Sequence, residues 1–226
     1  MAHAWMPEAR RIRAETDGGP LTGGAPRAVW LALGTAPGTV SVQSAAQRLI
    51  AERRPCHLIW DPLAGDIAQL ISVLRAGRAL GGADHLGWAP GRVRLHPETV
   101  NAEGRACVQI GVLSHQDEPF TDGPLAGIEA IVSWLDSWGV SRRWPAGRPA
   151  ECRLAELDGP VAAITGQRSR VAWARGGHFG ASQVPGCENT GPGDIDIDRI
   201  TGPHGLQARP RGISVPRSEA ALPIPA

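Results

Sequence analysis

Lysine and tyrosine are absent from this sequence, and phenylalanine occurs only twice. All 23 basic residues are therefore arginine. The lack of lysine excludes a lysine Schiff base, a phosphate-binding loop that ends in lysine and a serine–lysine dyad. Long apolar runs are missing too, since none approaches the roughly 20 residues that span a bilayer. The first residues, MAHAWMPEARRIR, lack the apolar core of a signal peptide. We expect a protein that is synthesised in the cytoplasm and stays soluble, without a membrane partner.

An excess of charge and a metal-binding cysteine pattern are also lacking. The 23 basic residues face 22 acidic ones, which leaves a formal net charge of +1. This balance gives no electrostatic footprint for nucleic acid. The four cysteines lie at least 35 residues apart, so no CxxC pair indicates a zinc ribbon or a thioredoxin-like site. We expect buried free thiols instead.

The 226 residues that are present suit one soluble domain with many loops. Hydrophobic residues make up 42% of the chain, and 29 glycines and 20 prolines interrupt it. We place an N-terminal arm over residues 1–27, a folded domain over 28–202, and a flexible tail containing proline and arginine over 203–226.

Hydrophobic periodicity predicts the main elements of that domain. Apolar runs predict strands over 28–33, 56–60, 67–73 and 107–113, the middle two forming a hairpin. Apolar residues at helical spacing predict amphipathic helices over 41–54, with Ser41 as N-cap, and over 124–138. Long loops are expected over 76–104 and from residue 176 to the acidic segment DIDIDRI. This order predicts the α/β class, a mixed central β-sheet flanked by helices.

Three segments carry a resemblance. They read CHLIWDPLAGDIAQLI, then VQIGVL followed by PFTDGPLAGIEAIVSWL, then GGHFGASQVPG with PGDIDIDRI. Together they resemble the zinc-dependent N-acetylmuramoyl-L-alanine amidase and peptidoglycan-recognition family, especially its actinobacterial and phage endolysin-like members, over roughly residues 28–200. The resemblance implies that family's fold and hydrolysis of the lactyl-amide bond of peptidoglycan. It also implies three zinc ligands: a histidine ending the first strand, a histidine in a Gly-His-Ser segment, and an Asp or Cys before Pro-Gly.

This sequence departs from the family at each ligand position. Leu31 stands in the place of the first histidine, Ala181 in that of the second, and Gly191 in that of the acidic ligand. Two further departures accompany them. Gly111 falls where members often carry glutamate, and Asn189 falls where a lysine or histidine commonly stabilises the oxyanion. Leu, Ala and Gly side chains have no lone pair for zinc, so the resemblance implies a vestigial metal site without a catalytic residue.

A rebuilt site is the alternative, and zinc would be a cofactor only in that case. His178, Cys187 and Glu188 lie in the same segment, but His178 is three residues from Ala181 and in an extended chain would face the other way. We interpret His178 as a loop imidazole packed against Phe179 or bonded to backbone. The grouping of Ser182, His178 and Asp194 lacks the GxSxG pattern of a nucleophile elbow.

Aromatic residues and a run of aspartates complete the candidate features. Trp60 and Trp88, with His178 and Asn189, would fall beside the substrate groove that family members form, although core packing is the commoner role of tryptophan. Trp134 and Trp138 are four residues apart and predict one packed helix face. The aspartates of DIDIDRI do not match a calcium loop and suit a helix N-terminus better.

These observations favour a catalytically inactive, amidase-like pseudoenzyme. Its expected partners are peptidoglycan fragments or, if the fold is reused in a bacteriophage particle, another protein of that assembly. The alternative is an active endolysin-type amidase with a rearranged site. Without a signal peptide, the protein would reach a cell wall only after release or as part of a particle.

Overall fold

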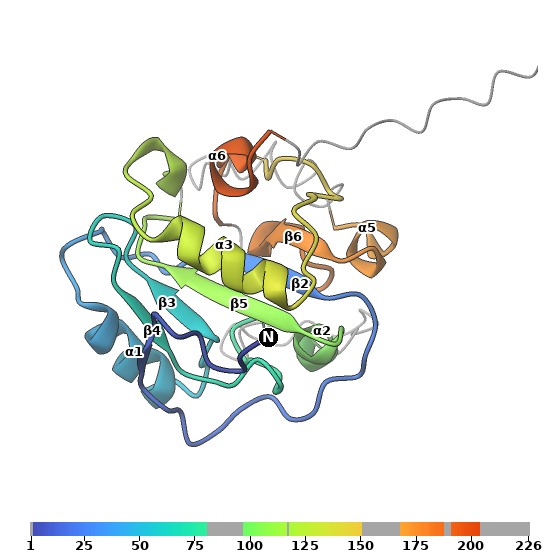
Figure 1. Cartoon of the computed structure of the whole chain (residues 1–226), viewed down its shortest axis with the longest axis horizontal. Coiled ribbons are helices and arrows are strands. Elements are labelled where there is room, and N and C mark those ends of the chain that lie inside the picture. Colours follow the sequence, from blue (N-terminus) through green and yellow to red (C-terminus); the bar gives the residue numbers. More distant parts are fainter. Residues whose placement is uncertain (1, 81–96, 117, 151–167, 188–190, 204–226) are drawn as a thin grey trace, which may run out of the picture.

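The computed structural model describes residues 2–80, 97–116, 118–150, 168–187 and 191–203. Their centre is a six-stranded mixed sheet with the strand order β1-β4-β3-β5-β2-β6 (Figure 1). The predicted α/β class with a mixed central sheet is confirmed. The strands are β1 (Arg10–Arg11), β2 (Arg27–Ala32), β3 (Leu58–Trp60), β4 (Ile67–Gln69), β5 (Cys107–Val112) and β6 (Gly177–Gly180).

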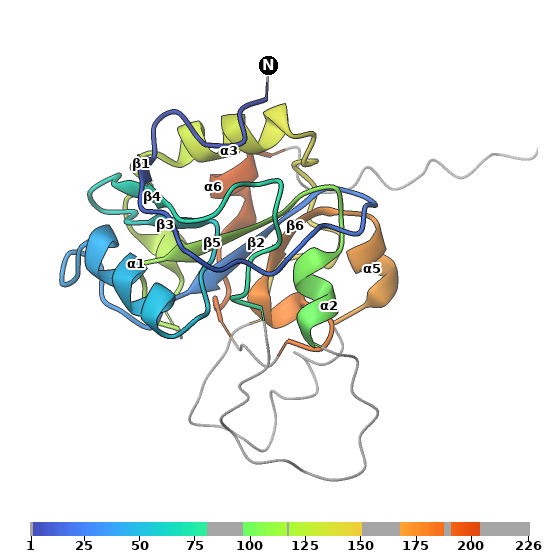
Figure 2. The same ribbon diagram turned by 90° about the horizontal axis from the view of Figure 1, so that it is seen from below.

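Helices cover both faces of the sheet and make three layers. In Figure 2, α3 lies above the sheet, and α1, α2 and α5 lie below it. The helices are α1 (Val42–Ala51), α2 (Pro97–Ala102), α3 (Ile128–Ser137), α5 (Arg170–Ala174) and α6 (Ile197–Thr201). Two single 3-10 turns, η1 (Phe120–Asp122) and η2 (Ala181–Gln183), follow β5 and β6 along the chain.

Strand β2 is the interior strand next to one edge of the sheet, where it pairs in parallel with β5 on one side and with the edge strand β6 on the other. All six of its residues are buried, as a continuous apolar run in a parallel sheet predicts. Its side chains alternate between the two faces. Trp30 packs in the core layer that contains α3, whereas Val29 and Leu31 pack in the layer that contains α1.

The predicted hairpin is confirmed, with shorter strands than the apolar runs suggested. β3 and β4 pair antiparallel, with Leu58 opposite Gln69 and Trp60 opposite Ile67. In the turn, the Asp61 carboxylate accepts a hydrogen bond from the Leu63 backbone N–H at 2.9 Å. Such an Asx turn satisfies backbone donors that the hairpin leaves unpaired.

The two predicted amphipathic helices are present, although each is shorter than expected. Ser41 caps α1, since its hydroxyl accepts a hydrogen bond from the Ser44 N–H at 3.1 Å. The α1 helix ends at Ala51 and not at residue 54. The α3 helix begins four residues later than predicted because the backbone groups of Ala126 bond to the hairpin and not within a helix. The Ala126 carbonyl accepts a hydrogen bond from the Trp60 indole at 2.8 Å, and the Ala126 N–H donates to the Pro62 carbonyl.

Three elements fall where the sequence predicted loops or an arm. The α2 helix lies in the expected loop 76–104 and begins at a proline, a favoured first helical residue. The β6 strand lies in the expected glycine-rich loop, and its first residue has to be glycine, since Gly177 has φ +97° and a Cβ there would lie 2.5 Å from the Arg143 carbonyl. Part of the N-terminal arm forms β1, which pairs with β4.

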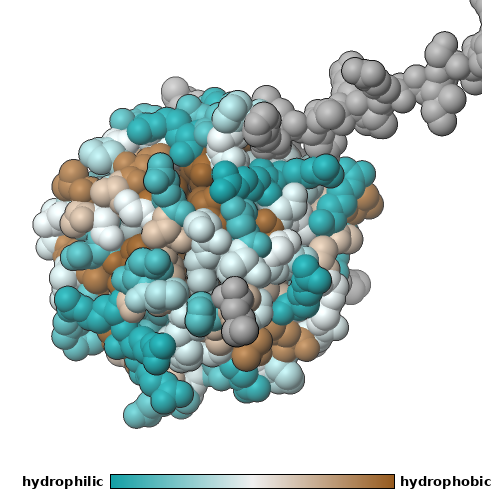
Figure 3. Space-filling model, in the orientation of Figure 1, coloured by the Kyte–Doolittle hydropathy of each residue, from teal (hydrophilic) through white to brown (hydrophobic). Residues whose placement is uncertain are grey.

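Other expectations concern the ends and the surface of the chain. Residues 204–226, nearly all of the predicted tail, lie outside the described residues. No helix in the described part of the chain has the length and apolar character that crossing a bilayer requires. Figure 3 shows apolar patches divided by hydrophilic ones on the visible face. The most exposed large apolar side chains described, Leu63, Leu74 and Val171, belong to separate segments.

Candidate functional site

The three predicted metal positions come from segments that meet at the carboxyl ends of β2 and β6. The register of these strands pairs Trp30 with Gly180, so Leu31 and Ala181 are the next residues on adjacent parallel chains. Both belong to the core layer that contains α1. Gly191 adjoins them, since its carbonyl accepts a hydrogen bond from the Ser182 N–H at 3.0 Å.

The side chains at these positions do not fit a zinc ion. Leu31 is 2% exposed and Ala181 is fully buried, and neither carries a donor atom. A Cβ added at Gly191 would lie 3.1 Å from the Gln116 carbonyl oxygen and 3.3 Å from the Ala32 Cβ, a tight fit even for one carbon. Throughout the described ranges, no group of three or more His, Cys, Asp or Glu side chains could hold a metal ion.

A pocket of about 280 Å³ lies beside Leu31. Its apolar wall consists of Leu31, Ala32, Leu49 and Ala79, all buried, and the α1 helix lies beside the carboxyl end of β2 here (Figure 2). The volume is close to the lower end of the roughly 300–1,000 Å³ typical of small-molecule sites. The pocket therefore has room for a ligand about the size of one or two amino-acid residues.

Charged and polar side chains complete the rim of this pocket. Arg48 and Glu52 come from α1 and its C-cap, Arg54 from the connection to β3, and Gln116 from the segment after β5. Sequence reasoning did not single out these four residues. The only signal was that Arg48 and Glu52 are four residues apart, which is equally typical of any solvated helix face.

His178 lies on the opposite face of the sheet from Ala181, as its spacing predicted, but in strand β6 and not in a loop. Its ring stacks on Trp30 with 6.0 Å between centroids and lies 5.5 Å from the Trp144 ring. Its Nδ1 accepts a hydrogen bond from the Trp30 indole at 3.1 Å. The prediction of a loop imidazole packed on Phe179 is therefore wrong, because strand alternation directs these two side chains to opposite faces.

Complete burial lowers the pKa of His178 to about 3. Because Nδ1 accepts, the neutral ring carries its proton on Nε2, and that atom has no partner among the described residues. The ring is thus a neutral part of the aromatic core. The Ser182 hydroxyl is also buried without a described partner, so His178 and Ser182 do not form the hydrogen bond that a catalytic pair needs.

The tryptophans that were candidates for a groove do not form one in the described residues. Trp60 is fully buried and packs edge-on against Trp30 at 6.2 Å, because strand β3 directs it into the core. Trp88 and Asn189 lie outside the described residues. The packed helix face is confirmed, since the Trp134 and Trp138 indoles both donate to the His3 carbonyl, at 2.8 and 3.2 Å.

The aspartates of DIDIDRI begin a helix, as predicted. The Asp196 carboxylate caps α6 by accepting from the Asp198 N–H at 3.0 Å. Arg148 lies 3.6 Å from the Asp194 carboxylate and 3.5 Å from that of Asp196. These carboxylates are therefore neutralised by an arginine and a helix terminus.

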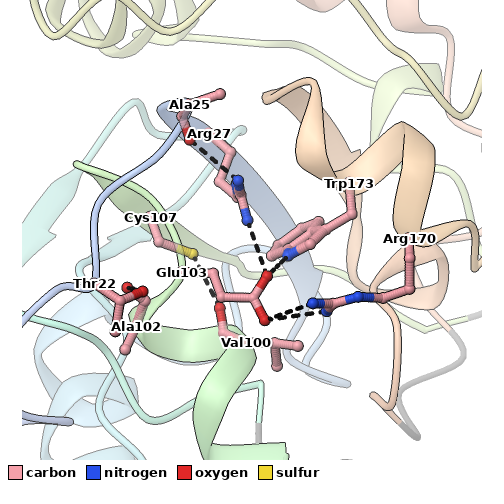
Figure 4. Close-up of polar contacts among 9 residues, drawn as sticks. All are labelled: Thr22, Ala25, Arg27, Val100, Ala102, Glu103, Cys107, Arg170 and Trp173. Carbon is pink, nitrogen blue, oxygen red and sulfur yellow. Dashed lines mark hydrogen bonds and ion pairs between the residues drawn. The ribbon is translucent and has the colours of Figure 1, made fainter.

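A partly buried ionic cluster, absent from the sequence predictions, ties β2 to α5 and to the end of α2 (Figure 4). Arg27, at the start of β2, is 3% exposed, and its Nη1 lies 3.7 Å from the Glu103 carboxylate. The same carboxylate accepts from the Trp173 indole at 2.7 Å and from both Nη atoms of Arg170 at 3.0 Å. The Arg27 guanidinium stacks 4.2 Å from the Trp173 ring. The charged and aromatic groups of the cluster contact one another and hold their elements together, so we assign the cluster a structural role.

A second buried group, His57, is also structural. Its Nδ1 accepts from the Gln109 N–H at 3.1 Å, so its Nε2 donates to the Arg75 carbonyl at 2.8 Å. Burial lowers the pKa of His57 to about 4. Cys56 and Cys107 are buried free thiols, as expected, and burial raises the pKa of each to about 12. Cys187 is buried as well. Cys152 lies outside the described residues.

Comparisons with known proteins give one distant structural similarity. The chain resembles the structure of the endolysin N-acetylmuramoyl-L-alanine amidase LysCS from Clostridium intestinale URNW, with a TM-score of 0.44 and 13% identity. The match covers 91% of this chain and 100% of the other. Neither a family model nor a curated protein matches the sequence. At so low a score the similarity carries no conclusion about function.

Proposed function

We propose that this chain is a catalytically inactive, amidase-like module that binds peptidoglycan fragments. The observation that carries the proposal is the meeting of Leu31, Ala181 and Gly191 at one edge of the sheet. The sequence resemblance implies zinc ligands at these three positions, yet none of the three residues has a side chain that can bind zinc. Loss of all the ligands within a retained frame is the pattern expected of a pseudoenzyme.

The chemistry of a zinc amidase requires three protein ligands and a fourth position for water. The metal would lower the pKa of that water and polarise the amide carbonyl. In this chain, Leu31 and Ala181 fill the space with buried apolar atoms. His178, which could have replaced a ligand, faces the other side of the sheet and accepts the Trp30 indole N–H. The contacts of these residues support the absence of zinc-dependent cleavage.

The pocket beside Leu31 supports a ligand-binding role over a purely structural one. A scaffold that only assembles with other proteins needs no concave site, whereas small-molecule sites are concave, apolar and equipped with a few polar groups. This pocket combines an apolar wall with the polar groups of Arg48, Glu52, Arg54 and Gln116.

Three measurements on the purified full chain test this proposal. We expect no stoichiometric metal by elemental analysis, no clearing of a cell-wall suspension, and saturable retention on insoluble cell walls. About one zinc per chain together with clearing would establish the alternative, an active amidase with a rearranged site. Inactivity without retention would refute peptidoglycan binding and favour a protein partner in an assembly.

Restoring the ligands tests the frame itself. The triple variant Leu31→His/Ala181→His/Gly191→Asp should bind about one zinc per chain, because the three positions meet at one edge of the sheet. The single variant Leu31→His is the control and should bind no stoichiometric zinc. The tight space at Gly191 requires a local shift, so circular dichroism must show that the triple variant is folded. A folded triple variant that binds no zinc would refute the retained frame.

A further inference from the structure

Strand β1 leaves one edge of the sheet open. It lies at the end of the strand order, where it pairs with β4 alone (Figure 2). The Ile12 and Ala14 N–H groups donate to carbonyls of β4 and of the residue after it, both at 3.0 Å. Backbone groups of successive strand residues point in opposite directions, so those of Arg11 and Arg13 face away from β4. No hydrogen bond joins these outward groups to another part of the described chain.

The side chains of the same two arginines lie together on one face of the strand. Residues two apart share a face, and the guanidinium groups of Arg11 and Arg13 lie over the Trp5 ring, 5.3 and 5.7 Å from its centroid. Ile12, between them, packs against the core layer that contains α1. Stacking orients a guanidinium and leaves its N–H edge available to an acceptor.

The charge of this segment is not neutralised within the described part of the chain. Arg11 and Arg13 are exposed, and neither forms an ion pair. Arg10 adds a third positive charge, and its guanidinium donates to a neutral side-chain amide of α1 at 3.2 Å. The flanking glutamates, Glu8 and Glu15, pair with none of the three. The open edge therefore carries an excess of positive charge, which favours an acidic partner.

We propose that β1 is a docking edge for an extended acidic segment of another protein, which adds a further strand to the sheet. The backbone of that segment bonds to the outward N–H and C=O groups of Arg11 and Arg13. Acidic side chains two residues apart face the two guanidinium groups, and the residue between them is apolar and extends the face formed by Ile12. This inference is independent of the proposed function, because the edge contains no residue of the pocket.

Other occupants of the edge fit these observations less well. A second copy of this chain would place arginines opposite arginines, and like charges directly opposite one another destabilise a sheet. A polyanion such as polyphosphate would bind the guanidinium groups but leave the backbone groups unused. Charged residues on an edge strand also prevent aggregation. That role alone predicts that no acidic strand binds.

Amide hydrogen exchange of the full chain tests the docking mode, with the peptide acetyl-TEVEVET-amide as the probe. A saturating amount should slow exchange of the Arg11 and Arg13 amides at least tenfold. The Ile12 and Ala14 amides, already bonded toward β4, should change little. Polyphosphate is the control and should leave all four rates unchanged. No saturable binding of the peptide, or binding without protection of the arginine amides, would overturn the proposal.

Two methylated peptides test the backbone pairing at constant charge. Successive peptide N–H groups in a strand point to opposite sides. N-methylation of the glutamates removes the donors that face β1 and should weaken binding at least tenfold. N-methylation of the valines removes only donors on the far side and should leave the affinity within about threefold of that of the parent peptide. Equal effects of the two modifications would refute strand addition.

Charge reversal tests the two arginines. The variant Arg11→Glu/Arg13→Glu should bind acetyl-TEVEVET-amide at least tenfold more weakly than wild type, and should bind acetyl-TRVRVRT-amide at least tenfold more tightly than wild type does. Arg53→Glu/Arg175→Glu is the matched control, since it makes the same change in net charge at exposed positions outside β1. If the control shifts both affinities equally, general electrostatics explains the effect and the docking edge is refuted. Thermal melts show that each variant is folded, and the methylated peptides test wild type without any substitution.

Discussion

Replacement of Glu103 by glutamine should destabilise the protein far more than loss of an ordinary surface ion pair. The variant keeps the size of the side chain but removes the only carboxylate that lies beside the buried Arg27 in the described structure. At 3.7 Å and an effective dielectric constant of about 20, the attraction between two unit charges is about 4 kcal/mol. Breaking a buried pair costs roughly 3–5 kcal/mol. Because Glu103 is 23% exposed, we expect a loss of about 2–4 kcal/mol in the free energy of unfolding.

Urea unfolding followed by circular dichroism measures this loss. Asp136→Asn is the matched control, since it removes a carboxylate 2.7 Å from Arg142 where both side chains are 38–50% exposed, and exposed pairs contribute about 0–1 kcal/mol. Adding Arg27→Met to Glu103→Gln should recover part of the stability, because the unpaired buried charge is then gone. A Glu103→Gln variant that is no less stable than Asp136→Asn would refute the reasoning.

Two further predictions concern stability. Unfolded histidines have a pKa of about 6.5, whereas burial lowers the pKa of His57 to about 4 and that of His178 to about 3. Below pH 6.5 only the unfolded chain takes up these protons. The free energy of unfolding should therefore decrease as the pH is lowered, and at pH 5 it should be roughly 2 kcal/mol per histidine below its value at neutral pH. Urea titrations at pH 7.5 and pH 5 measure the difference, and equal midpoints would contradict it. Gly77→Ala places a Cβ 2.3 Å from the hydrogen-bonded Gln109 side chain and should cost about 1–3 kcal/mol. Gly123→Ala, whose Cβ would meet nothing closer than 4.0 Å, is the control, and equal thermal melts for the two variants would refute the clash.

The candidate site shows where sequence reasoning stops. Leu31, Ala181 and Gly191 were found because a family pattern gave their positions in advance. Arg48 and Arg54 were not found, because on an amphipathic helix and its exit an arginine reads as a solvated residue. Their role in a pocket depends on how α1 packs beside the carboxyl end of β2, the element that precedes it, and residue spacing alone does not give that packing.

The fold divides in the same way. Strand β2 and helix α1 followed from apolar spacing, since a buried strand needs a continuous apolar run and a helix one apolar stripe. Helix α2 and strand β6 escaped detection because each is short and has no periodic pattern. Backbone pairing fixes β6: its amides bond to distant carbonyls, as His178 does to Arg143 at 2.8 Å.

The sequence by itself determined the α/β class, the hairpin, the cap at Ser41, the acidic start of the last helix and the absence of zinc-ligating side chains at three positions. These features depend on residue type and local spacing, which are properties of the chain. Tertiary structure decided that His178 is a neutral core residue stacked on Trp30, that Arg27 is buried beside Glu103, and that Leu31 forms the wall of a pocket. These properties depend on burial and on interatomic distance. Burial sets the free-energy cost of holding a charge, and distance decides whether a hydrogen bond forms. Only the folded chain fixes the burial of a residue and its distance from residues far along the chain.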